Sequence, residues 1–106
     1  MNYHVHVYFE DATEAIASAL RAQVETHPDA LALGRFHSEP VGPHPTRQFQ
    51  ILVAEVALEG FLVWLDGERH DLSVLIHSDI EDDLLSHTTL ARWLGDPHVL
   101  RLDRFR

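Results

Sequence analysis

The sequence predicts an α+β fold of the ferredoxin-like type, in which a four-stranded antiparallel sheet carries its helices on one face. Three segments alternate between apolar and polar residues, as strands do, and two stretches repeat apolar residues at helical spacing. Their order is β-α-β-β-α-β, which suits a single domain spanning residues 1–106. We also expect a short C-terminal helix. Because the sheet face without helices must be covered, we expect two copies of the chain to form a dimeric α+β barrel.

The first strand is expected at residues 3–9, where the sequence reads YHVHVYF. A helix follows, and Asp11 with Glu14 forms a capping-box pattern at its start. Its apolar positions recur at helical spacing and are Ile16, Leu20 and Val24. The helix is expected to end at His27-Pro28, because a residue before proline disfavours the helical region.

The middle of the chain supplies two further strands. Residues 31–38, LALGRFHS, form a weaker second strand, and VGPHP at 41–45 is a turn. Residues 48–56, QFQILVAEV, form the third strand.

A second helix, a fourth strand and a short helix complete the chain. The second helix runs to about Gly67, and its apolar positions follow the i, i+3, i+4, i+7 pattern: Leu58, Phe61, Leu62 and Leu65. Residues 71–77, DLSVLIH, form the fourth strand. The last helix is expected through LLSHTTLARWLG, with Gly95 as its stop.

The composition excludes several classes of function. A formal net charge of −9 argues against nucleic acids and anionic membranes, which both favour basic patches. Cysteine is absent, which rules out disulfides and thiolate zinc sites, and all eight basic residues are Arg. No apolar run reaches the roughly 18 residues of a membrane span and no leader opens the chain, so we expect a cytoplasmic protein. Nine histidines are the outlying number, and histidine is the commonest metal ligand.

The strand alternation separates an apolar face from a polar face. The apolar set consists of Val5, Val7, Phe9, Phe49, Ile51, Val53, Leu72, Val74 and Ile76. Alternation sends the other set to the opposite side: His4, His6, Tyr8, Gln48, Gln50, Ser73 and His77. We therefore expect several imidazoles to point away from the helices, where a metal, a ligand or a partner can bind.

His4 and His6 form an H-x-H pair, whose side chains leave one strand about 6.6 Å apart. In the ferredoxin-like strand order 4-1-3-2, His77 at the end of the fourth strand comes close to His4. Three imidazoles on adjacent strands are a plausible ligand set for Fe, Zn or Ni. The alternative is a solvated strand face whose histidines bind nothing.

His44 lies between two prolines, which hold an imidazole stiffly in a turn. One interpretation is that the stiff turn holds His44 ready to act as a metal ligand or as an acid–base group. The alternative is that the turn is only a rigid connection between strands and its histidine has no function. His87 lies in the expected last helix, which either folds over the histidine face as a lid or leaves this residue exposed. The guanidinium of Arg35 can form a bidentate pair with a substrate carboxylate. The alternative is an ordinary surface arginine that binds no ligand.

Five motifs together resemble the DOPA 4,5-dioxygenase family. They are YHVHVYF at the start, GRFH (34–37), VGPHP (41–45), LSVLIH (72–77) and SHTTLARWLG (86–95). The resemblance implies a ferredoxin-like fold, commonly dimeric, and extradiol cleavage of a catechol ring by non-haem iron. Carried over by position, the family's histidines are His4, His6, His37, His44, His77 and His87. The chain departs from the family pattern at Ser78, Ile80, Glu81 and Ser86.

The resemblance and the pattern together give a set of expected roles. The metal ligands are His4, His6 and His77, with Glu39 or Asp79 as possible replacements; the catalytic groups are His44 and His87; the substrate-binding residues are Tyr8, Arg35 and His37. The expected cofactor is Fe(II), with Zn or Ni possible in the purified protein. The expected partners are O2, a DOPA-like or related aromatic diol, and a second copy of the chain. The alternatives are a non-catalytic dimer that binds a metal or small ligand, and a dimer contact without ligand.

Overall fold

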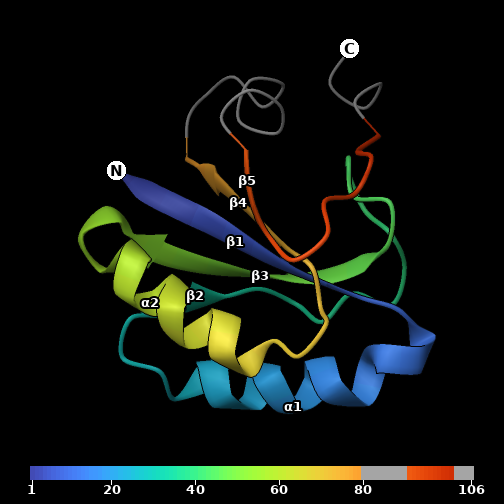
Figure 1. The fold of residues 1–106 in the computed structure, drawn as a ribbon, viewed down its shortest axis with the longest axis horizontal. Coiled ribbons are helices and arrows are strands. Elements are labelled where there is room, and N and C mark those ends of the chain that lie inside the picture. Colours follow the sequence, from blue (N-terminus) through green and yellow to red (C-terminus); the bar gives the residue numbers. More distant parts are fainter. Residues whose placement is uncertain (80–90, 102–106) are drawn as a thin grey trace.

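Five strands form one antiparallel sheet in the order β2-β3-β1-β4-β5, and two helices cover one of its faces (Figure 1). This computed structural model describes residues 1–79 and 91–101. Its elements are β1 (Asn2–Phe9), η1 (Asp11–Thr13), α1 (Glu14–Glu25), β2 (Ala32–Leu33), β3 (Arg47–Ala54), α2 (Glu55–Glu68), β4 (Val74–Ser78) and β5 (Arg92–Leu94). The first four strands have the expected order, so the ferredoxin-like prediction is confirmed.

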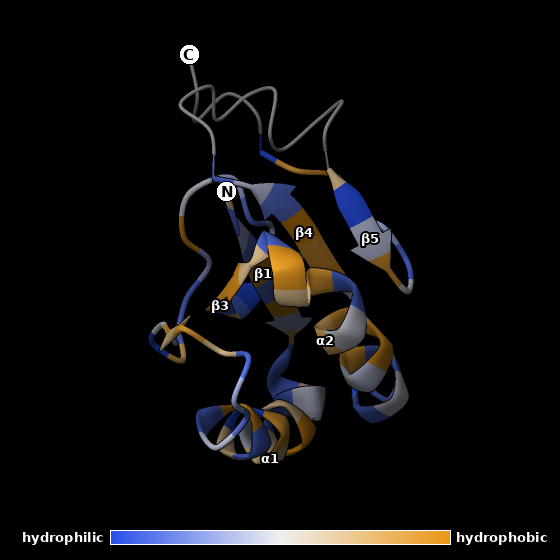
Figure 2. Cartoon of the chain, turned by 90° about the vertical axis from the view of Figure 1, so that its left-hand side faces the viewer, coloured by the Kyte–Doolittle hydropathy of each residue, from blue (hydrophilic) through white to orange (hydrophobic). Residues whose placement is uncertain are grey.

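The core lies between the sheet and the helices, and it contains every strand residue assigned to the apolar face. These are Val5, Val7, Phe9, Phe49, Ile51, Val53, Leu72, Val74 and Ile76. Helix α2 buries the four expected residues, and α1 buries Ala17, Leu20 and Val24. Ile16, expected on the buried stripe, is 39% exposed. Figure 2 shows hydrophobic stretches on α2 and on the strands beside it.

The second strand is much shorter than expected. Along the edge of β3, the backbone N–H groups of Leu31, Gly34 and His37 donate to the carbonyls of Leu52, Gln50 and Gln48. The outer segment therefore advances three residues for every two of β3. This mismatch is bulge-like and breaks the regular ladder, so only Ala32–Leu33 forms a strand.

Residues 92–94 form a strand where the end of a helix was expected. Arg92, Trp93 and Leu94 pair with Ile76, Leu75 and Val74, and this pairing covers the edge of β4. Gly95 ends β5 with a φ of 74°, and a Cβ there would lie 2.7 Å from Arg69 Nη1. The glycine predicted to stop a helix therefore stops a strand. The rest of the expected helix, including His87, lies outside the described residues.

The start of the first helix also differs from the expectation. The capping box forms around Glu10 and Thr13, and the Glu10 N–H donates to Thr13 Oγ1 at 2.9 Å. Asp11 and Glu14 instead accept hydrogen bonds from the guanidinium of Arg47, at 2.9 and 2.5 Å. These two bonds fasten the start of the helical segment to β3. Glu55 and Val56, expected to end the third strand, begin α2.

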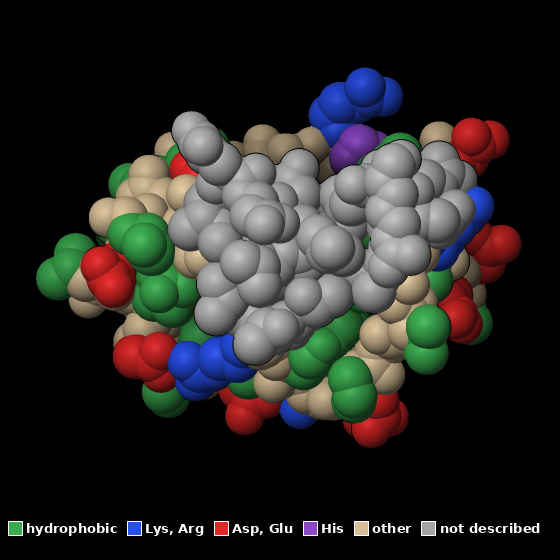
Figure 3. All heavy atoms as spheres, turned by 90° about the horizontal axis from the view of Figure 1, so that it is seen from above, with side chains coloured by type: hydrophobic (Ala, Val, Ile, Leu, Met, Phe, Trp, Pro, Cys, Tyr) green, Lys and Arg blue, Asp and Glu red, His purple; other side chains and the backbone are tan. Residues whose placement is uncertain are grey.

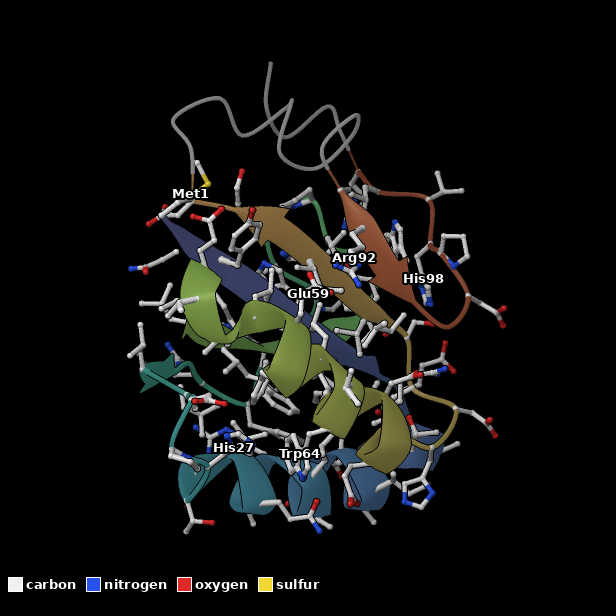
Figure 4. All side chains as sticks on the ribbon, turned by 60° about the vertical axis from the view of Figure 1, so that its left-hand side comes forward. Met1, His27, Glu59, Trp64, Arg92 and His98 are labelled. Carbon is white, nitrogen blue, oxygen red and sulfur yellow. The ribbon has the colours of Figure 1, made fainter. Side chains whose placement is uncertain are left out.

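The helix-free face is covered in part by the C-terminal segment, one of the two covers expected. Trp93 and His98 contact the ring of Tyr8, and the Arg101 N–H donates to the Pro43 carbonyl at 2.7 Å. Arg92 points the other way and pairs with Glu59 of α2 (Figure 4). Seen from above, the Arg side chains in view are separated by other residue types and form no single basic patch (Figure 3). Neither described helix is long and apolar enough to cross a membrane.

Phe61→Ala should lower the free energy of unfolding by about 3–5 kcal/mol, the usual cost of removing a buried aromatic ring. Phe61 is 0% exposed on α2 and contacts His27 and Trp64, which lie together in Figure 4. Val63→Ala on the same helix is the matched control, because Val63 is 75% exposed and its loss should cost about 0.5 kcal/mol or less. Equal midpoints of urea unfolding for the two variants would contradict this core.

Candidate metal centre

Three histidines from two strands meet on the helix-free face of the sheet. His4 and His6 alternate along β1 and share a face, and His77 on β4 is the direct cross-strand partner of His4. One ring nitrogen from each of the three lies within 4.8 Å of the others. The structure therefore brings together the three residues that the sequence predicts as ligands.

Hydrogen bonds select which nitrogen of His6 and His77 carries a proton. His6 Nδ1 lies 2.9 Å from Gln48 Oε1, and His77 Nδ1 lies 3.0 Å from the Ser78 carbonyl oxygen. An amide oxygen and a carbonyl oxygen only accept, so both Nδ1 atoms are donors. In the neutral rings each Nε2 then carries a lone pair, which is the form in which histidine binds metals.

The two Nε2 atoms of His6 and His77 lie 2.9 Å apart. With both Nδ1 atoms protonated, a hydrogen bond between them requires one ring to hold a second proton. A divalent cation can take the place of that proton. Two nitrogens bound at about 2.1 Å and at right angles on one metal lie about 3.0 Å apart, so the spacing fits two adjacent coordination positions. The donor set therefore fits a metal ion held through Nε2 atoms.

His4 lies on the more open side of this cluster. Its ring stacks on His77 with centroids 5.1 Å apart, and its side chain is 23% exposed. His4 Nε2 lies 3.3 Å from Asp79 Oδ1, so one carboxylate accompanies the three imidazoles. Glu39, the other carboxylate considered from the sequence, is exposed in the segment between β2 and β3.

His44 is buried next to the cluster without belonging to it. Its ring centroid lies 4.3 Å from that of His6, and the residue is 5% exposed. The turn that carries it is anchored by a bond from the His44 N–H to the Val41 carbonyl and by one from Arg101 to Pro43. The proline-bounded turn therefore presents this imidazole at a fixed place beside the three-histidine cluster.

Tyr8 is 2% exposed, and its hydroxyl lies 2.6 Å from His44 Nδ1. Burial raises the pKa of Tyr8 well above its ordinary value of 10.0. The ring meets Trp93 and His98 edge-on, at centroid distances of 5.6 and 5.0 Å. Tyr8, which the sequence predicts to contact substrate, thus directs its hydroxyl to His44, a candidate acid–base group.

Arg35 and His37 lie in the segment after β2, and neither is a member of the three-histidine group. Arg35 is exposed and His37 is half-buried, and the backbone of His37 bonds to Gln48 and Arg47. Their substrate-binding role stays a prediction, as do the roles of His44 and Tyr8. His87 lies outside the described residues.

Sequence reasoning gave no site role to Gln48, Trp93 or His98. Alternation had already placed Gln48 on the histidine face, and this parity is the signal that could have suggested a partner for His6. Trp93 was expected in a helix, which concealed that it shares the face of Leu75, its partner on β4. His98 follows the Gly95 turn, and no periodicity marks it.

Comparison with known proteins shows what the chain resembles. The model of the Dopa 4,5-dioxygenase family matches residues 3–104. The DOPA 4,5-dioxygenase of Amanita muscaria is 28% identical over 108 residues, which cover 94% of this chain and 47% of that protein. An uncharacterized 21.2 kDa protein of Botryotinia fuckeliana is 31% identical over 111 residues, which cover 94% of this chain and 61% of that protein.

A solved structure has the same fold. The crystal structure of a candidate dioxygenase from Nostoc punctiforme superposes with a TM-score of 0.91 at 28% sequence identity, and the match covers 97% of this chain and 89% of that one. The chain spans only about half to three fifths of the two curated relatives. Its match to the family model nevertheless extends over almost all of its own length, and the chain belongs to the Dopa 4,5-dioxygenase family.

Proposed function

We propose that this protein is an iron-dependent dioxygenase that opens the ring of a catechol with O2. The observation that carries the proposal is the facing pair of Nε2 atoms on His6 and His77, 2.9 Å apart, with both Nδ1 atoms already engaged as donors. Family membership supports the reaction class. In extradiol cleavage the ring bond beside the diol breaks and both atoms of O2 enter the product.

His4, His6 and His77 would hold Fe(II) as a three-imidazole face. Three protein ligands leave positions for the two catechol oxygens and for dioxygen, as in other non-haem iron oxygenases. When bound, the iron supplies coordination of the diol and activation of O2. Gln48 and the Ser78 carbonyl keep the Nδ1 protons in place, so that the Nε2 atoms remain available as donors to the metal.

His44 would supply acid–base chemistry at this site. A catechol loses a proton from a hydroxyl as it binds and a proton is returned later, and imidazoles beside the site can serve as the base and as the acid of these two steps. The turn and its bonds to Val41 and Arg101 hold His44 independently of a metal. His87 is the second acid–base candidate, and Arg35 with His37 would orient the polar tail of a DOPA-like substrate.

We also propose that the protein is a homodimer and that it acts in the cytoplasm.

The reaction is tested by loading the protein with Fe(II) under anaerobic conditions and then offering a panel of catechols. Addition of oxygen should produce stoichiometric oxygen uptake and the absorbance of a ring-opened product. Metal binding without turnover of any catechol would favour a non-catalytic metal-binding protein instead.

His6→Ala and His77→Ala should each abolish stable metal binding, with a loss larger than the roughly 10–100-fold that outer-shell changes produce. Metal content after Fe(II) loading is the measurement, and His4→Ala should also reduce it. Binding should weaken as the pH falls, because protons compete with the metal for the ring nitrogens.

The matched control for the ligand variants is His70→Asn, since His70 is exposed and Asn tolerates its φ of 55°. This variant should retain full metal content. Unchanged metal content in all three alanine variants would show that the metal, if bound, is held elsewhere.

Gln48 offers a test of the proton arrangement around the ligands. Gln48→Leu removes the acceptor for His6 Nδ1 and should weaken metal affinity by about 10–100-fold. Gln48→Glu retains an acceptor oxygen and should keep the affinity close to that of the natural sequence. Equal affinities for Leu and Glu at this position, measured by competition with a chelator, would remove Gln48 from the metal site.

His44→Ala should keep its iron and still bind a catechol, while turnover falls by about 10²–10⁴-fold. The reason is that His44 lies beside the cluster but outside the three-histidine group. Metal content and single-turnover rates measured on the same sample separate the two effects. Loss of metal from this variant would make His44 a ligand, and full activity would exclude it from the site.

A further inference from the structure

The hydrogen bond between Tyr8 and His44 has a direction that the surroundings determine. The Tyr8 hydroxyl is buried, and within residues 1–79 and 91–101 its hydrogen-bond partner is His44 Nδ1, at 2.6 Å. A phenol is protonated at neutral pH, and a buried O–H needs an acceptor. The hydroxyl therefore donates, and His44 Nδ1 accepts.

This direction fixes the tautomer of His44. A neutral imidazole whose Nδ1 accepts a hydrogen bond carries its proton on Nε2. His6 and His77 have the opposite arrangement, because their Nδ1 atoms donate to Gln48 and to the Ser78 carbonyl. The helix-free face thus holds imidazoles of both tautomers: His6 and His77 are protonated on Nδ1, and His44 is protonated on Nε2. The ring centroids of His6 and His44 lie 4.3 Å apart.

Both partners of the bond are held by other parts of the protein. The Tyr8 N–H donates to the Ser73 carbonyl at 2.9 Å, and its ring is packed edge-on against Trp93 and His98. The His44 turn is fastened to the C-terminal segment at Pro43. The arrangement therefore exists before any substrate or metal arrives.

We propose that Tyr8 is a positioning residue that sets the tautomer of His44 and keeps this fourth imidazole from becoming a metal ligand. With Nδ1 occupied by the hydroxyl and Nε2 protonated, the neutral ring has no lone pair left for a metal held by His6, whose ring centroid lies 4.3 Å from that of His44. The same arrangement makes the Nε2–H of His44 the group that donates to an oxygen of a bound diol. This last consequence rests on the proposed function, whereas the tautomer does not.

The test is Tyr8→Phe, which keeps the ring and removes only the hydroxyl. The tautomer of His44 is read from its ¹⁵N chemical shifts in the whole protein without added metal, at mildly alkaline pH where imidazoles are neutral. The His44 signals are assigned by their loss in His44→Ala. The natural sequence should show a proton on Nε2, and Tyr8→Phe should show a mixture of the two tautomers.

Tyr3→Phe is the matched control, because it makes the same chemical change on the same strand. Tyr3 packs against the core on the opposite face from Tyr8. Its substitution should leave the His44 signals and the rate unchanged. In the iron-loaded enzyme, Tyr8→Phe should lower kcat by about five- to tenfold, the effect of losing one hydrogen bond, with little change in KM for catechol.

A proton on His44 Nδ1 in the natural sequence would overturn the proposal, and so would an unchanged tautomer in Tyr8→Phe. The two proposals fail separately. If no catechol is turned over but the ¹⁵N shifts change as expected, the dioxygenase assignment fails and the positioning role of Tyr8 stands. If catechol is turned over and the shifts do not change, only the role of Tyr8 fails.

Discussion

The central position of β1 is the constraint on which the rest of the structure depends. This strand pairs with β3 on one side and with β4 on the other, so its backbone hydrogen bonds are taken up within the sheet. Its side chains alternate with a period of two, and the odd positions enter the core while His4, His6 and Tyr8 leave on the other face. A shift of the β1 register by one residue would therefore turn the core side chains toward the helix-free face and the histidines toward the core.

The histidine face depends on acceptors as much as on imidazoles. Each of the three histidines that are buried among the described residues has one ring nitrogen engaged by a group that is not a metal: Gln48 for His6, the Ser78 carbonyl for His77 and the Tyr8 hydroxyl for His44. The first two accept and the third donates. Rings that are equivalent in the sequence thus acquire different chemistry from partners on neighbouring strands, and only two of these three direct a lone pair to a common point.

Local and periodic features of the fold could be predicted from the sequence, and features that depend on distant contacts could not. Alternation gave the core set of β1, β3 and β4, and it placed His4, His6 and His77 together. The strand at 92–94 was missed because its three residues carry no clear period, and the free edge of β4 decides their conformation. The bond between Tyr8 and His44 joins residues 36 positions apart, and the direction of a proton in it depends on burial. The capping box was expected at Asp11 and Glu14, but both of these carboxylates pair with Arg47 on β3, a contact between segments more than 30 residues apart that the local pattern does not reveal.

The two edges of the sheet bear on how copies of this chain can associate. On one side, the segment at β2 advances three residues for every two of β3, so a regular row of donors and acceptors is interrupted. On the other side, β5 is three residues long and ends at a glycine that turns the chain away. Short or bulged edges offer a poor template for strand addition. Over the described residues, neither edge of the sheet thus favours lengthening by a neighbouring strand, and the edges favour association of two copies through a face or a loop instead.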